Sequence, residues 1–142
     1  MPLKLDIKSG EKMVINGAVL ENVGPNAKII VHNMATILRE KEVLTENVAA
    51  TPASRVYFAL QCAYMFPDKS DEYLSLLDKN LADYLTACPS AVGIGEKIRN
   101  YVGTEDLYKG LKAAHELIEH ETRILDAFNQ DLGHIEDAET VD

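Results

Sequence analysis

Residues 37–44, Ile-Leu-Arg-Glu-Lys-Glu-Val-Leu, and residues 51–58, Thr-Pro-Ala-Ser-Arg-Val-Tyr-Phe, decide the fold. Before this junction, apolar residues recur with a period of two, which is typical of strands; after it they recur about every 3.6 residues, as in helices. Thr51 is suited to cap a helix, and Pro52 suits the first helical position because its missing N–H would have no intrahelical acceptor there. We therefore expect a strand region in residues 1–45 and a helix that begins at Pro52.

The composition indicates one compact unit with an uneven charge. The chain has 142 residues, 46% of them hydrophobic, which is enough for a single domain spanning residues 1–142. Residues 1–50 contain six basic and six acidic side chains, so the whole net charge of −9 lies in residues 51–142. An acidic surface disfavours binding of nucleic acid by charge alone, because such binding depends on Lys and Arg at the phosphates. Any nucleic-acid contact would have to be local.

Signals for export, membrane insertion and redox chemistry are weak. The first residues lack a basic region followed by an apolar one, and no window approaches 18 uninterrupted apolar residues. We therefore expect a cytoplasmic protein with no membrane anchor. Cys62 and Cys88 fall on the apolar faces of expected helices and have no CxxC spacing, which favours small buried hydrophobes over metal ligands.

The N-terminal pattern predicts about five short strands. Asn16-Gly17 between two apolar runs predicts a hairpin, because both central residues of a type I′ turn need positive φ and these two tolerate it. We expect the strands to form a small antiparallel meander or open barrel with one face covered by helices. The expected strands are Leu3–Ile7, Met13–Ile15, Ala18–Leu20, Ile29–Val31 and Thr36–Leu38.

The rest of the chain predicts a bundle of about four helices in residues 51–128, and hence the α+β class. We expect Gly103 to end the third helix and Thr104 to cap the fourth, whose apolar stripe is interrupted by Glu121. Acidic residues accumulate from about 130 to 142, and this tail is expected to be disordered. The first three helices are expected at Pro52–Met65, from Asp68 or Ser70 to Cys88, and at about Ala91–Val102.

No motif predicts an enzyme, a metal site or a cofactor. His115 and His120 are five residues apart, which places their rings about 140° apart around a helix, whereas the zinc-protease motif needs a spacing of four. Pairing of His115 with Glu119 and of Glu116 with His120 is the simpler interpretation. Residues 93–97, Gly-Ile-Gly-Glu-Lys, lack the ending of a phosphate loop.

One local basic cluster is the candidate binding site. Arg39, Lys41 and Arg55 all lie in the junction. The alternative is a structural set of ion pairs with Glu40, Glu42 and Glu46 that joins strand to helix. Six tyrosines could offer rings for base stacking, but all fall at or beside apolar helix positions, which favours packing.

Several segments together resemble a known family. They are residues 3–5 with 10–11, 16–19, 37–41, 51–53 with 55–57, and 107–112 with 117–121. In this order, over roughly residues 3–125, they resemble FlbT, the flagellar biosynthesis repressor family.

The resemblance implies a small cytoplasmic regulator that acts after transcription. It would associate with the 5′ untranslated region of flagellin mRNA, control its translation or stability, and work alongside the partner FlaF. A second hypothesis is an adaptor that binds FlaF or flagellin and reaches RNA only indirectly. In either case Arg39, Lys41 and Arg55 are the candidate contacts with RNA or partner.

Overall fold

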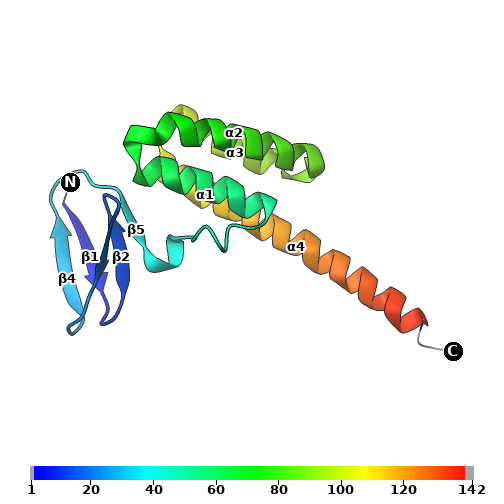
Figure 1. Ribbon diagram of the computed structural model, residues 1–142, viewed down its shortest axis with the longest axis horizontal. Coiled ribbons are helices and arrows are strands. Elements are labelled where there is room, and N and C mark those ends of the chain that lie inside the picture. Colours follow the sequence, from blue (N-terminus) through cyan, green and yellow to red (C-terminus); the bar gives the residue numbers. More distant parts are fainter. Residues whose placement is uncertain (1, 140–142) are drawn as a thin grey trace.

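The computed structural model describes the backbone of residues 2–139 and the side chains of residues 2–131. The strands lie at one end of the molecule and a four-helix region follows, with the last helix extending beyond the other three (Figure 1). The predicted α+β class, with about five strands followed by about four helices, is confirmed.

The five strands form two small antiparallel sheets. β2 (Lys12–Ile15) lies between β3 (Ala18–Glu21) and β5 (Ile37–Arg39), while β1 (Leu3–Ile7) pairs with β4 (Ala27–Val31). The hairpin predicted at Asn16-Gly17 is confirmed, since these residues have φ values of 51° and 82° and join β2 to β3. The arrangement is open and is not one continuous meander.

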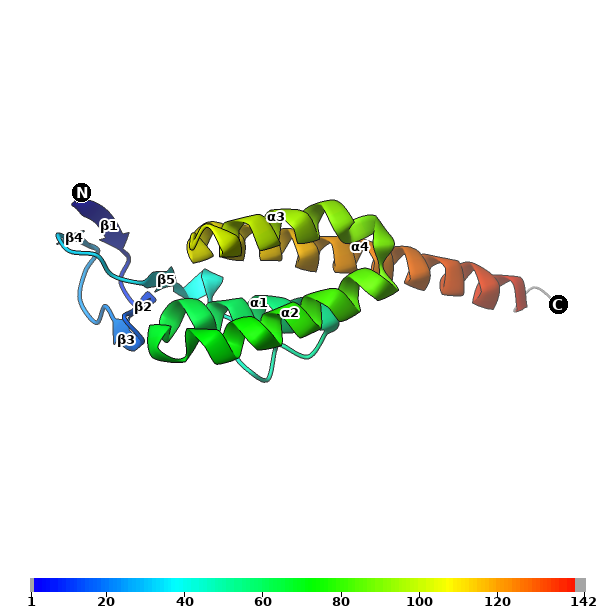
Figure 2. The same ribbon diagram turned by 90° about the horizontal axis from the view of Figure 1, so that it is seen from above.

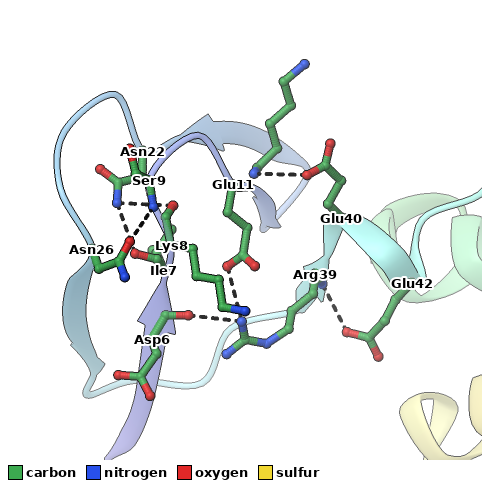
Figure 3. Close-up of polar contacts among 11 residues, drawn as sticks. Asp6, Ile7, Lys8, Ser9, Glu11, Asn22, Asn26, Arg39, Glu40 and Glu42 are labelled. Atoms are coloured by element: carbon green, nitrogen blue, oxygen red, sulfur yellow. Dashed lines mark hydrogen bonds and ion pairs between the residues drawn. The ribbon is translucent and has the colours of Figure 1, made fainter.

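Asn22 explains why β1 pairs with β4. Its side-chain amide donates to the carbonyl oxygens of Ile7 and Pro25, both at 3.0 Å. The backbone carbonyl oxygen of Asn22 accepts from Gly10 N at 2.7 Å. Ser9 N, in the turn after β1, donates to Asn26 Oδ1, in the loop before β4, at 2.8 Å (Figure 3). These bonds hold the end of β1 against the loop that leads into β4.

The four helices are α1 (Pro52–Met65), α2 (Ser70–Ala87), α3 (Val92–Gly103) and α4 (Leu107–Glu139). Three short 3₁₀ turns accompany them: η1 (Glu40–Glu42), η2 (Pro67–Lys69) and η3 (Pro89–Ala91). The predicted start of α1 is confirmed: Thr51 Oγ1 accepts from Ser54 N at 3.2 Å, and Ser54 Oγ accepts from Thr51 N at 2.9 Å. This reciprocal capping satisfies two backbone donors that the helix start would otherwise leave free.

The capping residues predicted at three other helix ends were wrong, although α2 does start at Ser70. Neither Asp68 nor Ser70 caps α2, because η2 leads directly into it. Gly103 is still helical, and Glu105 instead adopts the positive φ of 62° after α3. Asp106, not Thr104, caps α4 by accepting from Lys109 N at 3.2 Å.

The predicted disordered tail also differs from the structure. α4 continues through residue 130 to Glu139, while residues 140–142 lie outside the described part of the chain.

The core is built around α1. This helix packs against α2 and α4, and α3 packs on α4 (Figure 2). Val56 and Leu60 of α1 are fully buried, as are Leu81 of α2 and Leu117 of α4. Gly95 allows α3 to approach α2, because a Cβ there would lie 2.5 Å from Leu85 Cδ1. Among the described residues, no helix is long and apolar enough to cross a membrane.

Candidate functional site

Glu42 is the centre of the junction. Its carboxylate accepts from Arg39 N at 3.0 Å and from the Tyr108 hydroxyl of α4 at 2.8 Å. Its carbonyl oxygen accepts from the buried Tyr57 hydroxyl of α1. One residue of η1 therefore connects β5 to two helices, and it determines where the neighbouring Lys41 lies.

Both tyrosines that contact Glu42 are hydrogen-bond donors at neutral pH. Burial, followed by the charge of Glu42, raises the pKa of Tyr57 to about 12. Burial, followed by the hydrogen bond to Glu42, raises the pKa of Tyr108 to about 12. Since each phenol keeps its proton, both bonds persist over the whole physiological pH range.

Arg39 has a structural position. Its Nη1 donates to the Asp6 carbonyl oxygen at 3.0 Å and pairs with Glu11 Oε1 at 3.3 Å (Figure 3). The side chain is 31% exposed and connects β5 to β1 and to the turn after it. An ion pair was therefore the right kind of contact, but the predicted partners were wrong: Glu42 accepts the backbone N–H of Arg39 and not its guanidinium.

Lys41 lies in a cleft between η1, α1 and α4. The cleft has a volume of about 280 Å³ and is lined by Lys41, Glu42, Tyr57, Leu111, Lys112 and His115. Lys112 Nζ lies 5.0 Å from the centre of the Tyr108 ring, a cation–π distance. His115 Nδ1 lies 3.1 Å from Glu119 Oε1, so this predicted pair is confirmed. We call the site formed by Lys41, Lys112 and His115 the cationic cleft.

More lysines continue from the cationic cleft along α3 and α4. Lys112 also lines a shallow hollow of about 130 Å³ together with Lys97 and Lys109. Lys97 is paired with Glu116 at 2.9 Å, which raises the pKa of its ammonium, and Lys109 is 3.6 Å from Asp106. Lys112 therefore lines two neighbouring hollows, and in the second one Lys97 and Lys109 are each paired with a carboxylate.

Arg55 lies elsewhere. It is exposed on the first turn of α1, two residues before Tyr57, which places the two side chains about 160° apart around the helix. Tyr57 faces Glu42, so Arg55 faces away from the cationic cleft. In the described part of the chain, no hydrogen bond or ion pair joins the Arg55 side chain to Lys41 or Glu42. The structure thus groups Lys41 with two residues of α4 and not with Arg55.

The predicted pairing of Glu116 with His120 was wrong. Glu116 pairs with Lys97, and His120 bridges α2 and η3: its Nδ1 is hydrogen-bonded to the Tyr84 hydroxyl and its Nε2 to Ser90 Oγ, both at 2.9 Å. No cluster of three His, Cys, Asp or Glu side chains that could hold a metal ion lies in the described part of the chain. All six tyrosines are buried or partly buried, which supports packing as their role.

Sequence reasoning found Lys41 and missed Lys112, His115 and Glu42 as parts of one site. A signal was available, because Lys109 and Lys112 are three residues apart and so share one face of α4.

Together, fold and cleft define a class: a small α+β protein whose strand region is joined to a four-helix region, with lysines gathered beside the junction. Within that class, this chain belongs to the flagellar protein FlbT family, whose family model matches residues 3–125.

Individual relatives support this membership. The chain is 34% identical over 125 residues to a probable flagellum biosynthesis repressor protein FlbT 1 of Bradyrhizobium diazoefficiens, covering 87% of this chain and 85% of that protein. It is 32% identical over 137 residues to a probable flagellum biosynthesis repressor protein FlbT of Caulobacter sp. strain K31, covering 95% and 99%. It is 30% identical to the flagellum biosynthesis repressor protein FlbT of Caulobacter vibrioides, covering 95% and 92%. No solved structure matches the chain.

Proposed function

We propose that this protein is a cytoplasmic, non-enzymatic regulator of flagellum biosynthesis that associates with the 5′ untranslated region of flagellin mRNA and controls its translation or stability. The regulatory role is supported by family membership and by the names of the relatives. The RNA part is carried by one observation, the cationic cleft, where Lys41 and Lys112 line a hollow beside a histidine.

The chemistry of the cleft suits a phosphate group. Lysine ammonium groups contact phosphate oxygens through charge-assisted hydrogen bonds. The net charge of −9 repels a phosphate backbone elsewhere, so contacts are few. Two to three phosphates on a single strand give a slope of about −1.4 to −2.1 in a plot of log affinity against log salt concentration.

The test is binding of the purified protein to a flagellin leader RNA and to a scrambled RNA across several salt concentrations. We expect Lys41→Ala and Lys112→Ala each to weaken binding and to reduce the salt slope by about 0.7. Lys79→Ala is the matched control, since this exposed lysine of α2 lies outside the cleft and should change neither quantity. Equal binding of both RNAs, or undetectable binding, would exclude direct recognition.

Arg39 and Arg55 have different roles in the proposed function. Arg39 supports the cleft by holding β5, from which η1 follows. Arg55 supplies a contact with RNA or a partner on another face, since its side chain is exposed. Arg55→Ala should therefore lower regulation of flagellin without changing the salt slope at the cationic cleft.

A second candidate is an adaptor that acts through FlaF or flagellin. It is favoured by exposed apolar residues on α4, where Leu125 is 47% and Phe128 is 57% exposed. Co-purification from cells with and without nuclease separates the two functions. Recovery of a partner after nuclease treatment supports the adaptor, whereas recovery of RNA without FlaF supports direct binding.

A further inference from the structure

An apolar groove lies at the end of the helical region opposite the strands. It has a volume of about 460 Å³ and is bounded by the start of α1 at Pro52, the end of α2 at Ala87 and Cys88, and α4 at Ile124 and Leu125. Tyr84 of α2 also lines it. This volume falls in the range of sites that accept several apolar side chains.

Polar contacts hold the walls of the groove in place. Glu121 Oε2 accepts from Ala53 N at 3.0 Å, which fastens α4 to the first turn of α1. His120 is hydrogen-bonded to Tyr84 and Ser90, which fastens α4 to α2 and η3. The groove is therefore already formed, and a ligand would not have to order it.

The apolar face continues past the groove along α4. Ile124, Leu125 and Phe128 are 41%, 47% and 57% exposed, and with Glu121 they follow the spacing of one helix face. Past the groove, α4 extends beyond the other three helices (Figures 1 and 2). A single projecting helix gains little stability in water without packing, so this face is suited to being covered.

The charges around the groove decide which occupant fits. Its lining contains Asp83 and Glu121 but no Lys or Arg. Along α4, residues 116–131 contain five acidic side chains and one basic one, Arg123. A second copy of the chain would bring the same acidic residues against these, and an RNA backbone would be repelled likewise.

We propose that this groove and the adjoining face of Leu125 and Phe128 bind an amphipathic helix of a protein partner, with an apolar stripe in the groove and Lys or Arg at its edges. Helices of this kind dock through anchors at positions i, i+3 or i+4, and i+7. Basic side chains of the partner would face Asp83 and Glu121. The inference rests on the adaptor function for the existence of a partner and is independent of the cationic cleft.

The test uses three labelled 18-residue peptides and fluorescence anisotropy with the full-length protein. The first has leucines on one helix face and lysines elsewhere, the second has glutamates in place of the lysines, and the third is a shuffled form of the first. We expect the first to bind at least about tenfold more tightly than the other two, a difference of about 1.4 kcal/mol. Equal binding of the first and the shuffled peptide would mean charge attraction alone and would overturn the proposal.

Variants assign the binding to the groove. Leu125→Ser should weaken the first peptide about tenfold, and Asp83→Lys should weaken it while strengthening the glutamate peptide. Leu76→Ser is the matched control, because Leu76 is 45% exposed on α2 and does not line the groove. Unchanged binding by Leu125→Ser would refute the assignment.

Sedimentation of the protein without peptide completes the test. Self-association that Leu125→Ser abolishes would make a second copy the occupant and also overturn the proposal. If these experiments fail, the groove proposal is wrong. The two proposed functions are tested separately, by nuclease-resistant recovery of FlaF or flagellin and by RNA binding at the cationic cleft.

Discussion

Replacing Glu42 with alanine tests whether this residue holds the strand region to the helices. The substitution removes two carboxylate hydrogen bonds, one at 3.0 Å from Arg39 N and one at 2.8 Å from the Tyr108 hydroxyl. Hydrogen bonds to charged groups contribute about 1.5–3 kcal/mol each, and water can reach both partly buried donors once the carboxylate is gone. We therefore expect the free energy of unfolding to fall by about 2–4 kcal/mol. Glu42→Gln keeps one carbonyl acceptor and should cost roughly half as much.

Urea denaturation followed by circular dichroism measures this loss. The matched control is Glu40→Ala in the same 3₁₀ turn: Glu40 is exposed, and Lys12 N lies 3.4 Å from its carboxylate. We expect the control to change stability by about 0.5 kcal/mol or less. If Glu42→Ala and Glu40→Ala have the same midpoint and slope, the role assigned to Glu42 is refuted.

Two further predictions concern the junction. Arg39→Ala should lower the free energy of unfolding by about 1–2 kcal/mol, because it breaks an exposed hydrogen bond to the Asp6 carbonyl oxygen and a partly buried ion pair with Glu11. Arg55→Ala should cost about 0.5 kcal/mol or less, and a larger drop in the urea midpoint for Arg55→Ala would show that the two roles are reversed. Stability should also fall between pH 10 and pH 12, because unfolded tyrosines lose their protons near pH 10 while the folded pKa values of Tyr57 and Tyr108 are about 12. For the buried Tyr57, a pKa that changes from 10 to about 12 corresponds to at most roughly 2.7 kcal/mol. Tyr57→Phe should therefore give a flatter profile in urea titrations at pH 9, 10 and 11, and an unchanged slope would contradict the assignment.

Local chemistry made parts of the fold predictable from the sequence. The start of α1 depends on Thr51, Pro52 and Ser54, which are neighbours in the chain, and the β2–β3 hairpin depends on Asn16-Gly17 alone. The pairing of β1 with β4 joins Leu3 to Val31, and Asn22 stabilises it through contacts with two separate turns. No periodicity in the sequence encodes that choice of partner, because alternation gives the face of a strand and not its neighbour.

Helix ends and the polar residue in an apolar stripe depend on tertiary contacts. Glu121 interrupts the stripe of α4 because its carboxylate accepts the N–H of Ala53, an orphan donor at the start of another helix. Gly95 costs helix propensity in α3 but allows Leu85 to pack directly on it. Glu121 interrupts the apolar pattern of α4, and Gly95 lowers the helix propensity of α3. Each is explained by a contact with another helix, so the pattern of a single helix could not account for it.

The residues of the cationic cleft could be predicted only in part, because tertiary contacts bring some of them together. Lys41 could be singled out because it lies in the junction, but Lys112 and His115 reach it only after α4 has folded back across α1. Arg55, which is closer to Lys41 in sequence, faces away from the cationic cleft because it lies two residues before Tyr57, and side chains at that spacing on a helix point in nearly opposite directions. Sequence proximity therefore selected one residue of the cationic cleft, Lys41, and left out two that the fold supplies.

The arrangement of charge along α4 connects the two proposed surfaces. The cationic cleft uses Lys112 and His115, and the apolar groove uses Leu125, ten residues further along the helix and hence about 15 Å away. That distance exceeds the Debye length of about 8 Å at physiological salt, so a phosphate at the cleft and a basic helix at the groove interact only weakly through charge. One helix can thus present two surfaces of opposite preference at once. If RNA and partner are nevertheless found to exclude each other, the cause must be steric overlap or a change in the position of α4, and lowering the salt concentration would not remove it.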